Sequence, residues 1–296
     1  MRTVFIGAVE FSERALRKLL ETDMGVEIVG VCTLEKSPTN ADHRDLSGIA
    51  KEARVPWQYT PRINAAESID WIREFTPDAV FCFGWSRLLG PDLLGVPQRG
   101  VVGFHPAALP ANRGRHPLVW ALVRGLPETA STFFLMDEGA DTGPILDQRK
   151  VPIEYGDDAR SLYDKVTAAA LAQLEDWVPA WVESRLEPRP QEPNTGNVWR
   201  KRGKADGAID WRMDARGIYD LVRGLSRPYV GAHFSRGENE IKVWRCEEVA
   251  AFVPENLEPG KVLEVGEKGP VIKTGRGAVR LREIEPWVEL VEGEYL

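Results

Sequence analysis

The first half of the chain alternates short β-branched or aromatic runs with segments of helical period, and this alternation continues to about residue 155. It is typical of strands that are joined by helical crossovers within a mostly parallel sheet. Six runs predict strands, at residues 3–7, 26–33, 79–82, 101–105, 129–136 and 145–153.

Apolar residues recur at helical spacing elsewhere in this half. Four segments predict helices, at residues 12–21, 64–75, 117–124 and 157–183. Asn64 and Glu67 have the spacing of a capping box, which favours a helix that begins near Asn64. Pro117 can occupy the first turn of its helix, because the N–H that proline lacks would have no partner there.

The second half begins with a proline-rich stretch. Residues 186–197, LEPRPQEPNTGN, contain three prolines and little periodicity, which indicates an interdomain linker. After a short helix at 215–225, short strands are predicted at 240–244, 260–265, 271–274 and 278–284, and their spacing favours a small barrel. The predicted fold class is therefore α/β: a Rossmann-like, mostly parallel sheet domain over 1–189, a linker over 190–207, and a β-rich, OB-like barrel domain over 208–296.

Composition narrows the class of protein. The hydrophobic fraction of 43% and the charged fraction of 28% are those of an ordinary globular chain. No apolar run approaches the roughly 20 residues of a membrane-spanning helix, and the N-terminus enters a strand pattern without a cleavable signal, so a cytoplasmic location is expected. Three widely spaced cysteines, Cys32, Cys82 and Cys246, favour buried structural thiols.

The net charge of −7 argues against a chain built to hold nucleic acid, because that affinity comes mainly from Lys and Arg at the phosphates. A small anionic substrate held by a few arginines stays compatible with it. Several other chemistries lack support. Gly7 alone is not a dinucleotide fingerprint, no P-loop or serine-nucleophile elbow occurs, and the four scattered histidines have no metal-ligand spacing, so no metal is expected.

One dense block carries candidate chemistry: GFHPAALPANRGRHP at 103–117, followed by DEGADTG at 137–143. His105 falls where a buried strand ends, and ligands of open α/β sheets collect at the carboxyl ends of strands. Asp141 lies in a loop between Gly139 and Gly143, which allow close approach of backbone to a ligand. A His and an Asp at one sheet edge can form a general acid–base pair, although a structural histidine would give the same isolated signal.

The block closely resembles the folate-dependent formyltransferases, whose motif has the form Asn-x-His-x-x-x-L-P-x-x-R-G-R-x-P, some 35 residues before an x-x-x-D-x-G loop. Further similarity covers nearly the whole chain, including Arg227-Pro228-Tyr229 and Pro259-Gly260-Lys261. The resemblance implies that His105 and Asp141 are catalytic and that 10-formyltetrahydrofolate is the formyl donor. It also implies donor-binding residues in two loops: Phe83, Gly84, Trp85, Arg87, Leu88 and Leu89 in the first, and Gly139 and Asp141 in the second.

One position departs from the family motif. Gly103 stands where the family has an asparagine that is thought to steady the oxyanion of the tetrahedral intermediate. Loss of one such donor typically costs about 2.7–4 kcal/mol of transition-state stabilisation. Asn112 is the nearest amide and is predicted as the catalytic replacement; a backbone N–H freed at Gly103 and an ordered water are its rivals.

The pattern of charge along the chain favours one class of formyl acceptor. Relatives that act on initiator tRNA generally have a basic stretch after the second strand and a basic C-terminal domain, and neither is found here. We therefore expect a nucleotide-linked amino sugar, with methionyl-tRNA formyltransferase as the alternative and a folate- or sugar-nucleotide-binding protein of weak or no transferase activity as the second. The basic run at 200–204 is either a diphosphate clamp or a solvated face, and a homodimer is compatible with the resemblance.

Overall fold

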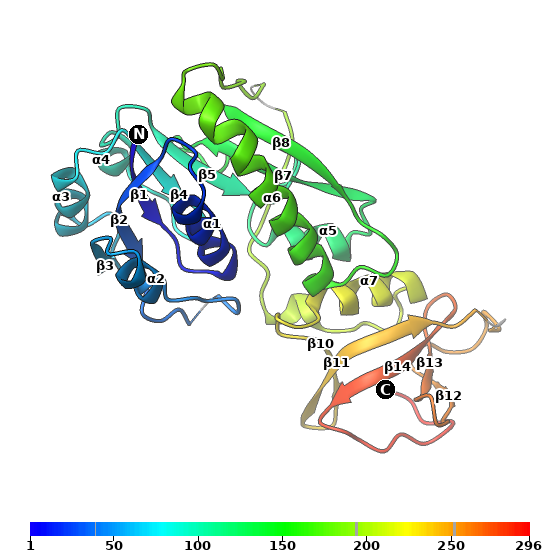
Figure 1. The fold of residues 1–296 in the computed structure, drawn as a ribbon. Helices are drawn as coiled ribbons and strands as arrows, with labels where there is room; N and C mark the ends of the chain where they lie inside the picture. Colours follow the sequence, from blue (N-terminus) through cyan, green and yellow to red (C-terminus); the bar gives the residue numbers. More distant parts are fainter. Residues whose placement is uncertain (39, 193–194, 251–252) are drawn as a thin grey trace. The chain divides into compact units, whose positions relative to one another are not determined.

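The computed structural model describes residues 1–38, 40–192, 195–250 and 253–296, and the chain forms two compact units (Figure 1). The first unit comprises Met1–Gly114, Ala130–Val151 and Lys165–Trp199. The second unit comprises Arg115–Thr129, Pro152–Asp164 and Arg200–Leu296. Both units therefore combine segments that are distant in the sequence, and the predicted domain boundaries at 189 and 207 stay a prediction.

The first unit is built on a seven-stranded sheet in the order β3-β2-β1-β4-β5-β7-β8. Its strands are β1 (Arg2–Ile6), β2 (Glu27–Thr33), β3 (Trp57–Tyr59), β4 (Ala79–Cys82), β5 (Val101–His105), β7 (Glu128–Leu135) and β8 (Ile145–Pro152). Strands β1 to β5 pair in parallel, and β7 pairs antiparallel with β5. The strand order reverses direction between β1 and β4, where ligands of such sheets bind.

Six helices belong to the α/β half of the chain: α1 (Glu10–Glu21), α2 (Ser47–Glu52), α3 (Ala66–Glu74), α4 (Pro91–Leu94), α5 (Pro117–Val123) and α6 (Ala159–Val182). Every residue of β4 is buried, as expected of a parallel strand covered on both faces. Aromatic rings fill the space between the sheet and α6, because Phe81 and Phe133 lie 5.6 and 5.1 Å from the ring of Trp177.

The second unit contains a five-stranded antiparallel sheet in the order β10-β11-β14-β13-β12. Its elements are α7 (Ala215–Leu225), β10 (Ala232–Arg236), β11 (Asn239–Glu248), β12 (Val262–Glu264), β13 (Val271–Lys273) and β14 (Ala278–Glu285). Helix α7 begins at Asp214, whose side chain accepts from the Gly217 N–H at 2.6 Å. Its apolar face joins Phe234 and Ile241 of the sheet in one buried core.

The predicted α/β sheet followed by a β-rich C-terminal part is confirmed, and the predicted helices and strands recur within a few residues. The predicted capping box at Asn64 is wrong. Helix α3 begins after Ala65, and the Asn64 side chain instead donates to the Leu88 carbonyl at 3.0 Å and accepts from the Gly90 N–H at 2.8 Å. Asn64 is therefore a brace for the loop that follows β4.

The sequence patterns missed several short elements: α2, β3, α4, β10, a 3₁₀ turn at Lys204–Gly207, and the paired strands β6 (Arg113–Gly114) and β9 (Val198–Trp199). Most of them have two to four residues, which is too short to show a period. All three cysteines are buried and unbridged, and burial raises the pKa of the Cys32 and Cys246 thiols to about 12. Within the described ranges, no helix is both long and apolar enough to cross a membrane.

Candidate active site

His105 is the last residue of β5 and is only 4% exposed. It pairs with Thr132 of β7, whose hydroxyl donates to the Ala107 carbonyl at 2.7 Å. Gln148 donates to the same hydroxyl and to the Leu109 carbonyl, both at 2.9 Å. The loop after His105 is therefore fastened to two neighbouring strands, which fixes the direction in which the imidazole leaves the sheet.

The two ring nitrogens of His105 have different partners. Nε2 lies 2.8 Å from the backbone oxygen of Asn112, and because a carbonyl only accepts, Nε2 carries a proton. Nδ1 lies 3.5 Å from Oδ2 of Asp141. The ring nitrogen that is not bound to the backbone thus faces a carboxylate.

Asp141 is held by contacts on both its side chain and its backbone. Oδ2 accepts from the Gly114 N–H at 2.8 Å, and the backbone oxygen accepts from Nε of Arg113 at 3.1 Å. The loop that carries it is an Asx-type turn, since Oδ1 of Asp137 accepts from the Gly139 N–H at 3.0 Å and from the Thr142 hydroxyl at 2.6 Å. A side chain at Gly139 would begin 2.0 Å from that hydroxyl and would displace it from Asp137.

Left-handed backbone is concentrated at this site. Asn112 and Asp141 have φ values of 64° and 59°. Asn and Asp are the non-glycine residues that tolerate this region best, and such residues persist only where surrounding contacts hold them. Gly114, at φ 97°, is needed for a second reason: a Cβ there would lie 2.3 Å from the carbonyl oxygen of Trp199. The site loops are therefore fixed by packing and hydrogen bonds.

Asn112 lies beside His105, but the contact is made by its backbone carbonyl. That oxygen is an acceptor and cannot stabilise an oxyanion. The backbone N–H of Asn112 donates to Oδ1 of Asn197 at 2.9 Å. A catalytic role for the Asn112 side-chain amide stays a prediction.

Gly103 sits in the middle of β5, opposite Cys82 and Phe134. A Cβ at this position would lie 2.9 Å from Cγ of Met136 and 2.9 Å from Cζ of Phe134. The space in which the family's asparagine side chain would begin is therefore already occupied. A hydrogen-bond donor that replaces the family's amide must therefore reach the oxyanion from a position other than residue 103.

Two site residues were missed because they lie in the segment predicted to be a linker. Gln191 donates to the Asp141 and Gly143 carbonyls at 2.9 and 2.7 Å, and its Oε1 accepts from Nη2 and Nε of Arg113 at 2.6 and 3.2 Å. The Asn197 side chain binds the Asn112 N–H, and β9 then pairs with β6. An amide among prolines was the sole sequence signal for either residue. Residues 193 and 194 lie outside the described ranges.

The predicted donor loop follows β4, next to the point where the strand order reverses. Phe83 is fully buried and its N–H and carbonyl bind Ile6 and Ser12, so its ring belongs to the core; Leu89 is buried as well. Leu88 is 58% exposed, and Arg87 donates to the Pro61 carbonyl.

Trp85 gives the clearest sign of a ligand in this loop. Its indole packs against the core, and Nε1 is buried without a hydrogen-bond partner among the described residues. A buried donor without an acceptor is unfavourable, so a bound molecule that offers an acceptor would stabilise it. Gly84, at φ 70°, lets the loop turn where a Cβ would meet Val9 at 2.1 Å. These residues fit a flat ligand that combines an apolar face with hydrogen-bonding atoms.

Two further histidines, His43 and His233, have partners of their own. His43 binds the Ala8 carbonyl through Nδ1 at 2.9 Å, and Nε2 of His233 lies 3.7 Å from Glu240. In the described part of the chain, no group of three His, Cys, Asp or Glu side chains has the arrangement of a metal site.

Comparison with known proteins identifies the family. The family model described as formyl transferase matches residues 1–176, and the model of the formyl transferase C-terminal domain matches residues 201–288. The chain belongs to the formyl transferase family. It is an enzyme of formyl-group transfer, and the motif around His105 and Asp141 lies within the N-terminal match.

Relatives of known sequence cover almost all of this formyltransferase. The methionyl-tRNA formyltransferase of Citrifermentans bemidjiense is 30% identical over 289 residues, which are 96% of this chain and 89% of the relative. The methionyl-tRNA formyltransferase of Geobacter sulfurreducens is 29% identical over the same shares.

Two solved structures share the fold. The N-formyltransferase of Helicobacter canadensis, crystallised with folinic acid and dTDP-3-aminofucose, has a TM-score of 0.72 at 16% identity and matches 95% of this chain and 98% of its own. HypX of Aquifex aeolicus, in complex with tetrahydrofolic acid, has a TM-score of 0.63 at 18% identity over 96% of this chain. The chain spans 44% of HypX.

Proposed function

We propose that this formyltransferase uses 10-formyltetrahydrofolate to formylate the primary amine of a nucleotide-linked amino sugar. The observation that carries the choice of acceptor is the charge of the C-terminal part. From Ala208 to the end there are 13 basic and 16 acidic residues. A surface that binds tRNA draws most of its affinity from cations at the phosphates, so this balance disfavours it.

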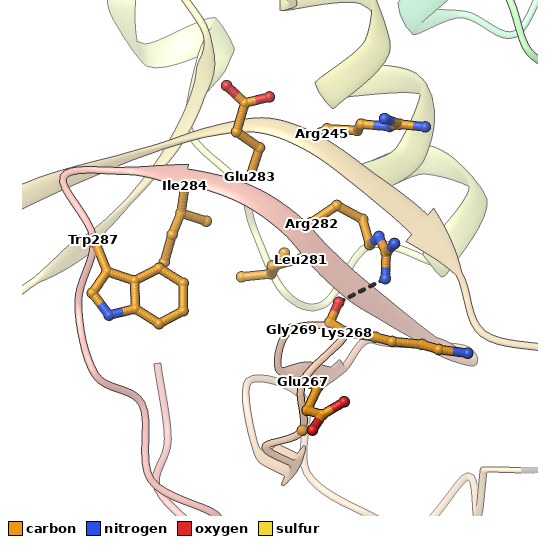
Figure 2. A pocket seen from close by; sticks show the side chains of 10 residues that line it. Arg245, Glu267, Lys268, Gly269, Leu281, Arg282, Glu283, Ile284 and Trp287 are labelled. Atoms are coloured by element: carbon orange, nitrogen blue, oxygen red, sulfur yellow. Dashed lines mark hydrogen bonds between the residues drawn. The ribbon is translucent and has the colours of Figure 1, made fainter.

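The hollow on the C-terminal sheet has the same mixed character (Figure 2). It measures about 410 Å³ and is lined by Arg245, Lys268 and Arg282 but also by Glu267 and Glu283. Arg282 donates to the Lys268 carbonyl at 2.7 Å, so part of its donor capacity is used internally. Trp287 is 73% exposed at the edge of the hollow, whose three basic and two acidic side chains leave an excess of only one positive charge.

The segment after β2 supports the same choice. Arg44 lies 3.4 Å from Glu13 and 3.9 Å from Glu10, so its charge is balanced within the protein. Asp45 accepts from the Tyr59 hydroxyl at 2.8 Å, which keeps a carboxylate at this surface. A long polyanion would meet both acidic and paired basic groups here.

The chemistry follows from the His105–Asp141 pair. The folate donor supplies the formyl carbon, which is attacked by the acceptor's primary amine. That amine must lose a proton as its nitrogen bonds to carbon, and N10 of the folate must gain one as it leaves. Nδ1 of His105 is the ring nitrogen placed to exchange that proton, and the Asp141 carboxylate, 3.5 Å away, orients it.

Methionyl-tRNA formyltransferase is the second candidate, because the relatives at 29–30% identity carry that name. A binding protein with weak or no transferase activity is the third, since Gly103 replaces the family's asparagine. Charge distribution separates the first two candidates, and catalytic turnover separates both from the third.

The decisive experiment offers the purified chain 10-formyltetrahydrofolate together with dTDP-, UDP- and GDP-linked amino sugars and, in parallel, charged initiator tRNA. We expect a mass gain of one formyl group on an amino-sugar nucleotide. Faster formylation of the tRNA than of every sugar nucleotide would overturn the proposal. Tight donor binding without transfer to any acceptor would favour the binding protein.

A salt titration provides an independent control. A tRNA substrate that neutralises several phosphates should lose affinity steeply between 50 and 200 mM salt, by about 10³-fold or more. A sugar nucleotide contacts few charges, and its KM should change far less. A steep salt dependence of the KM of the preferred acceptor would contradict the assignment of a sugar nucleotide.

A further inference from the structure

Trp120 of α5 is surrounded by cations that come from the start of the C-terminal part. The guanidinium of Arg202 lies 4.5 Å from the ring centroid, and that of Arg200 lies 5.5 Å from it. Nε1 of Trp120 donates to the Arg200 carbonyl at 3.0 Å. The indole therefore holds the 200–202 segment by one hydrogen bond and two cation–π contacts.

Arg202 is a buried cation with an unused donor. The residue is 9% exposed, Nη2 donates to the Asp206 carbonyl, and Nε is buried with no hydrogen-bond partner in the described ranges. Burial lowers the pKa of Arg202, because removal from water disfavours the charged guanidinium. A negatively charged acceptor at Nε would supply the missing hydrogen bond and further stabilise the charged guanidinium.

The local carboxylates do not supply that acceptor. Asp206 already accepts from both terminal nitrogens of Arg200, and Glu240 pairs with Lys204 at 2.6 Å. Lys201 is exposed and makes no ion pair within the described part of the chain.

Burial and the positive charges of this segment lower the pKa of His116. Its pKa is lowered first by burial and then by Arg115, Arg202 and Lys201, against the opposing charge of Asp206. Three cations thus act on one imidazole, and Asp206, the carboxylate whose charge opposes them, already accepts from Arg200.

We propose that this basic cluster, defined as Arg115, His116, Trp120, Lys201 and Arg202, binds the phosphate groups of the acceptor's diphosphate. The planar guanidinium fork matches phosphate oxygens, and a protonated His116 would add a donor. Arg115 follows Gly114 in the sequence, and the Gly114 N–H donates to the Asp141 carboxylate. Naming the ligand as the acceptor's diphosphate rests on the proposed function; the presence of a phosphate site does not.

Direct binding tests the site without any catalysis. Isothermal titration with inorganic pyrophosphate, at constant ionic strength, should give saturable binding to the intact chain. Arg202→Gln should weaken it by about tenfold or more, since a hydrogen bond to a charged group is worth about 1.5–3 kcal/mol. Lys201→Gln should weaken it by a few-fold, as expected of an exposed charge.

Arg212→Gln is the matched control: this exposed arginine of the same unit pairs with Asp210 and should leave binding unchanged. If Arg202→Gln melts at a lower temperature, Arg202→Lys keeps the charge without the Nε donor and gives the same test in a milder form. Equal pyrophosphate affinity in wild type, Arg202→Lys and Lys201→Gln would overturn the site, as would failure of wild type to bind pyrophosphate at millimolar concentration.

The titration of His116, followed by the NMR shift of its ring protons, provides a second readout. Bound pyrophosphate stabilises the imidazolium, so the His116 pKa should rise on binding, and a structural cluster would leave it unmoved. A nucleoside diphosphate should compete with pyrophosphate, whereas displacement by initiator tRNA alone would reject the small-diphosphate assignment. Pyrophosphate binding without sugar formylation would retain the phosphate site and reject the proposed acceptor, so the two failures differ.

Discussion

Replacement of Gln191 by alanine should slow formyl transfer even though this residue lies outside the family motif. Its side chain joins the Asp141 and Gly143 carbonyls to the Arg113 guanidinium. Asp141 in turn places its carboxylate 3.5 Å from His105. The substitution would therefore loosen the loop that orients the imidazole.

The magnitude follows from the bonds that are lost. Two donated bonds to neutral carbonyls are worth about 1 kcal/mol each, and the contact with the charged guanidinium about 1.5–3 kcal/mol. Arg113 keeps partners at the Asp141 and Thr195 carbonyls, at 3.1 and 3.2 Å, so no buried charge is abandoned. We expect Gln191→Ala to lower the free energy of unfolding by about 3.5–5 kcal/mol, which is the sum of these three bonds. A displacement near 1 Å should lower kcat by about 10- to 100-fold.

Steady-state kinetics and urea unfolding measure the two effects separately. Gln191→Glu sharpens the test, because a carboxylate strengthens the contact with Arg113 but cannot donate to the two carbonyls. If the support of the Asp141 loop matters, this variant should be as slow as Gln191→Ala, whereas Gln98→Ala, at an exposed position, should behave as wild type. Normal kcat in Gln191→Glu would refute the reasoning and assign the effect to Arg113 alone.

Four further outcomes are expected. His105→Ala and Asp141→Asn should each lower kcat by about 10²–10⁴-fold, with donor affinity little changed in a binding titration. Asn112→Ala should lower kcat without weakening donor binding if its amide acts only in the transition state; unchanged kcat would exclude the amide. Gly103→Asn should lower the melting temperature, because overpacking against side chains 2.9 Å away costs about 1–3 kcal/mol. His116 has a pKa below its unfolded value of about 6.5, so the unfolded state binds more protons and unfolding free energy should fall as pH drops through that value, less so in His116→Gln.

Much of the α/β half could be predicted because its central strands are continuous apolar runs that end at definite residues. β4 and β5 begin and end where the hydrophobic pattern does. The position of His105 at a strand end followed from the same pattern. The contact with Asp141 depended on the folded loops, which the motif implied only through the family resemblance.

The errors have a common physical origin. Asn64 and Glu67 have the spacing of a capping box. The Asn64 side chain instead makes two hydrogen bonds to the backbone at Leu88 and Gly90, which are distant in sequence. Gln191 and Asn197 were overlooked because proline-rich segments show no period, and their partners lie about 50 to 85 residues away. Long-range hydrogen bonds leave no signature in a one-dimensional pattern.

The contacts of Arg189, Gln191 and Gly196 limit where this enzyme can be divided. Arg189 bridges to Ile145, Gln191 binds the Asp141 loop, and Gly196 passes so close to Pro110 that a Cβ would lie 1.9 Å from its carbonyl. A chimera that exchanges C-terminal domains at the predicted domain end, residue 189, would therefore replace Gln191 and Asn197, which contact the loops of the active site. A junction placed after Trp199 keeps these contacts native. It is therefore the better position at which to exchange C-terminal domains between acceptor specificities.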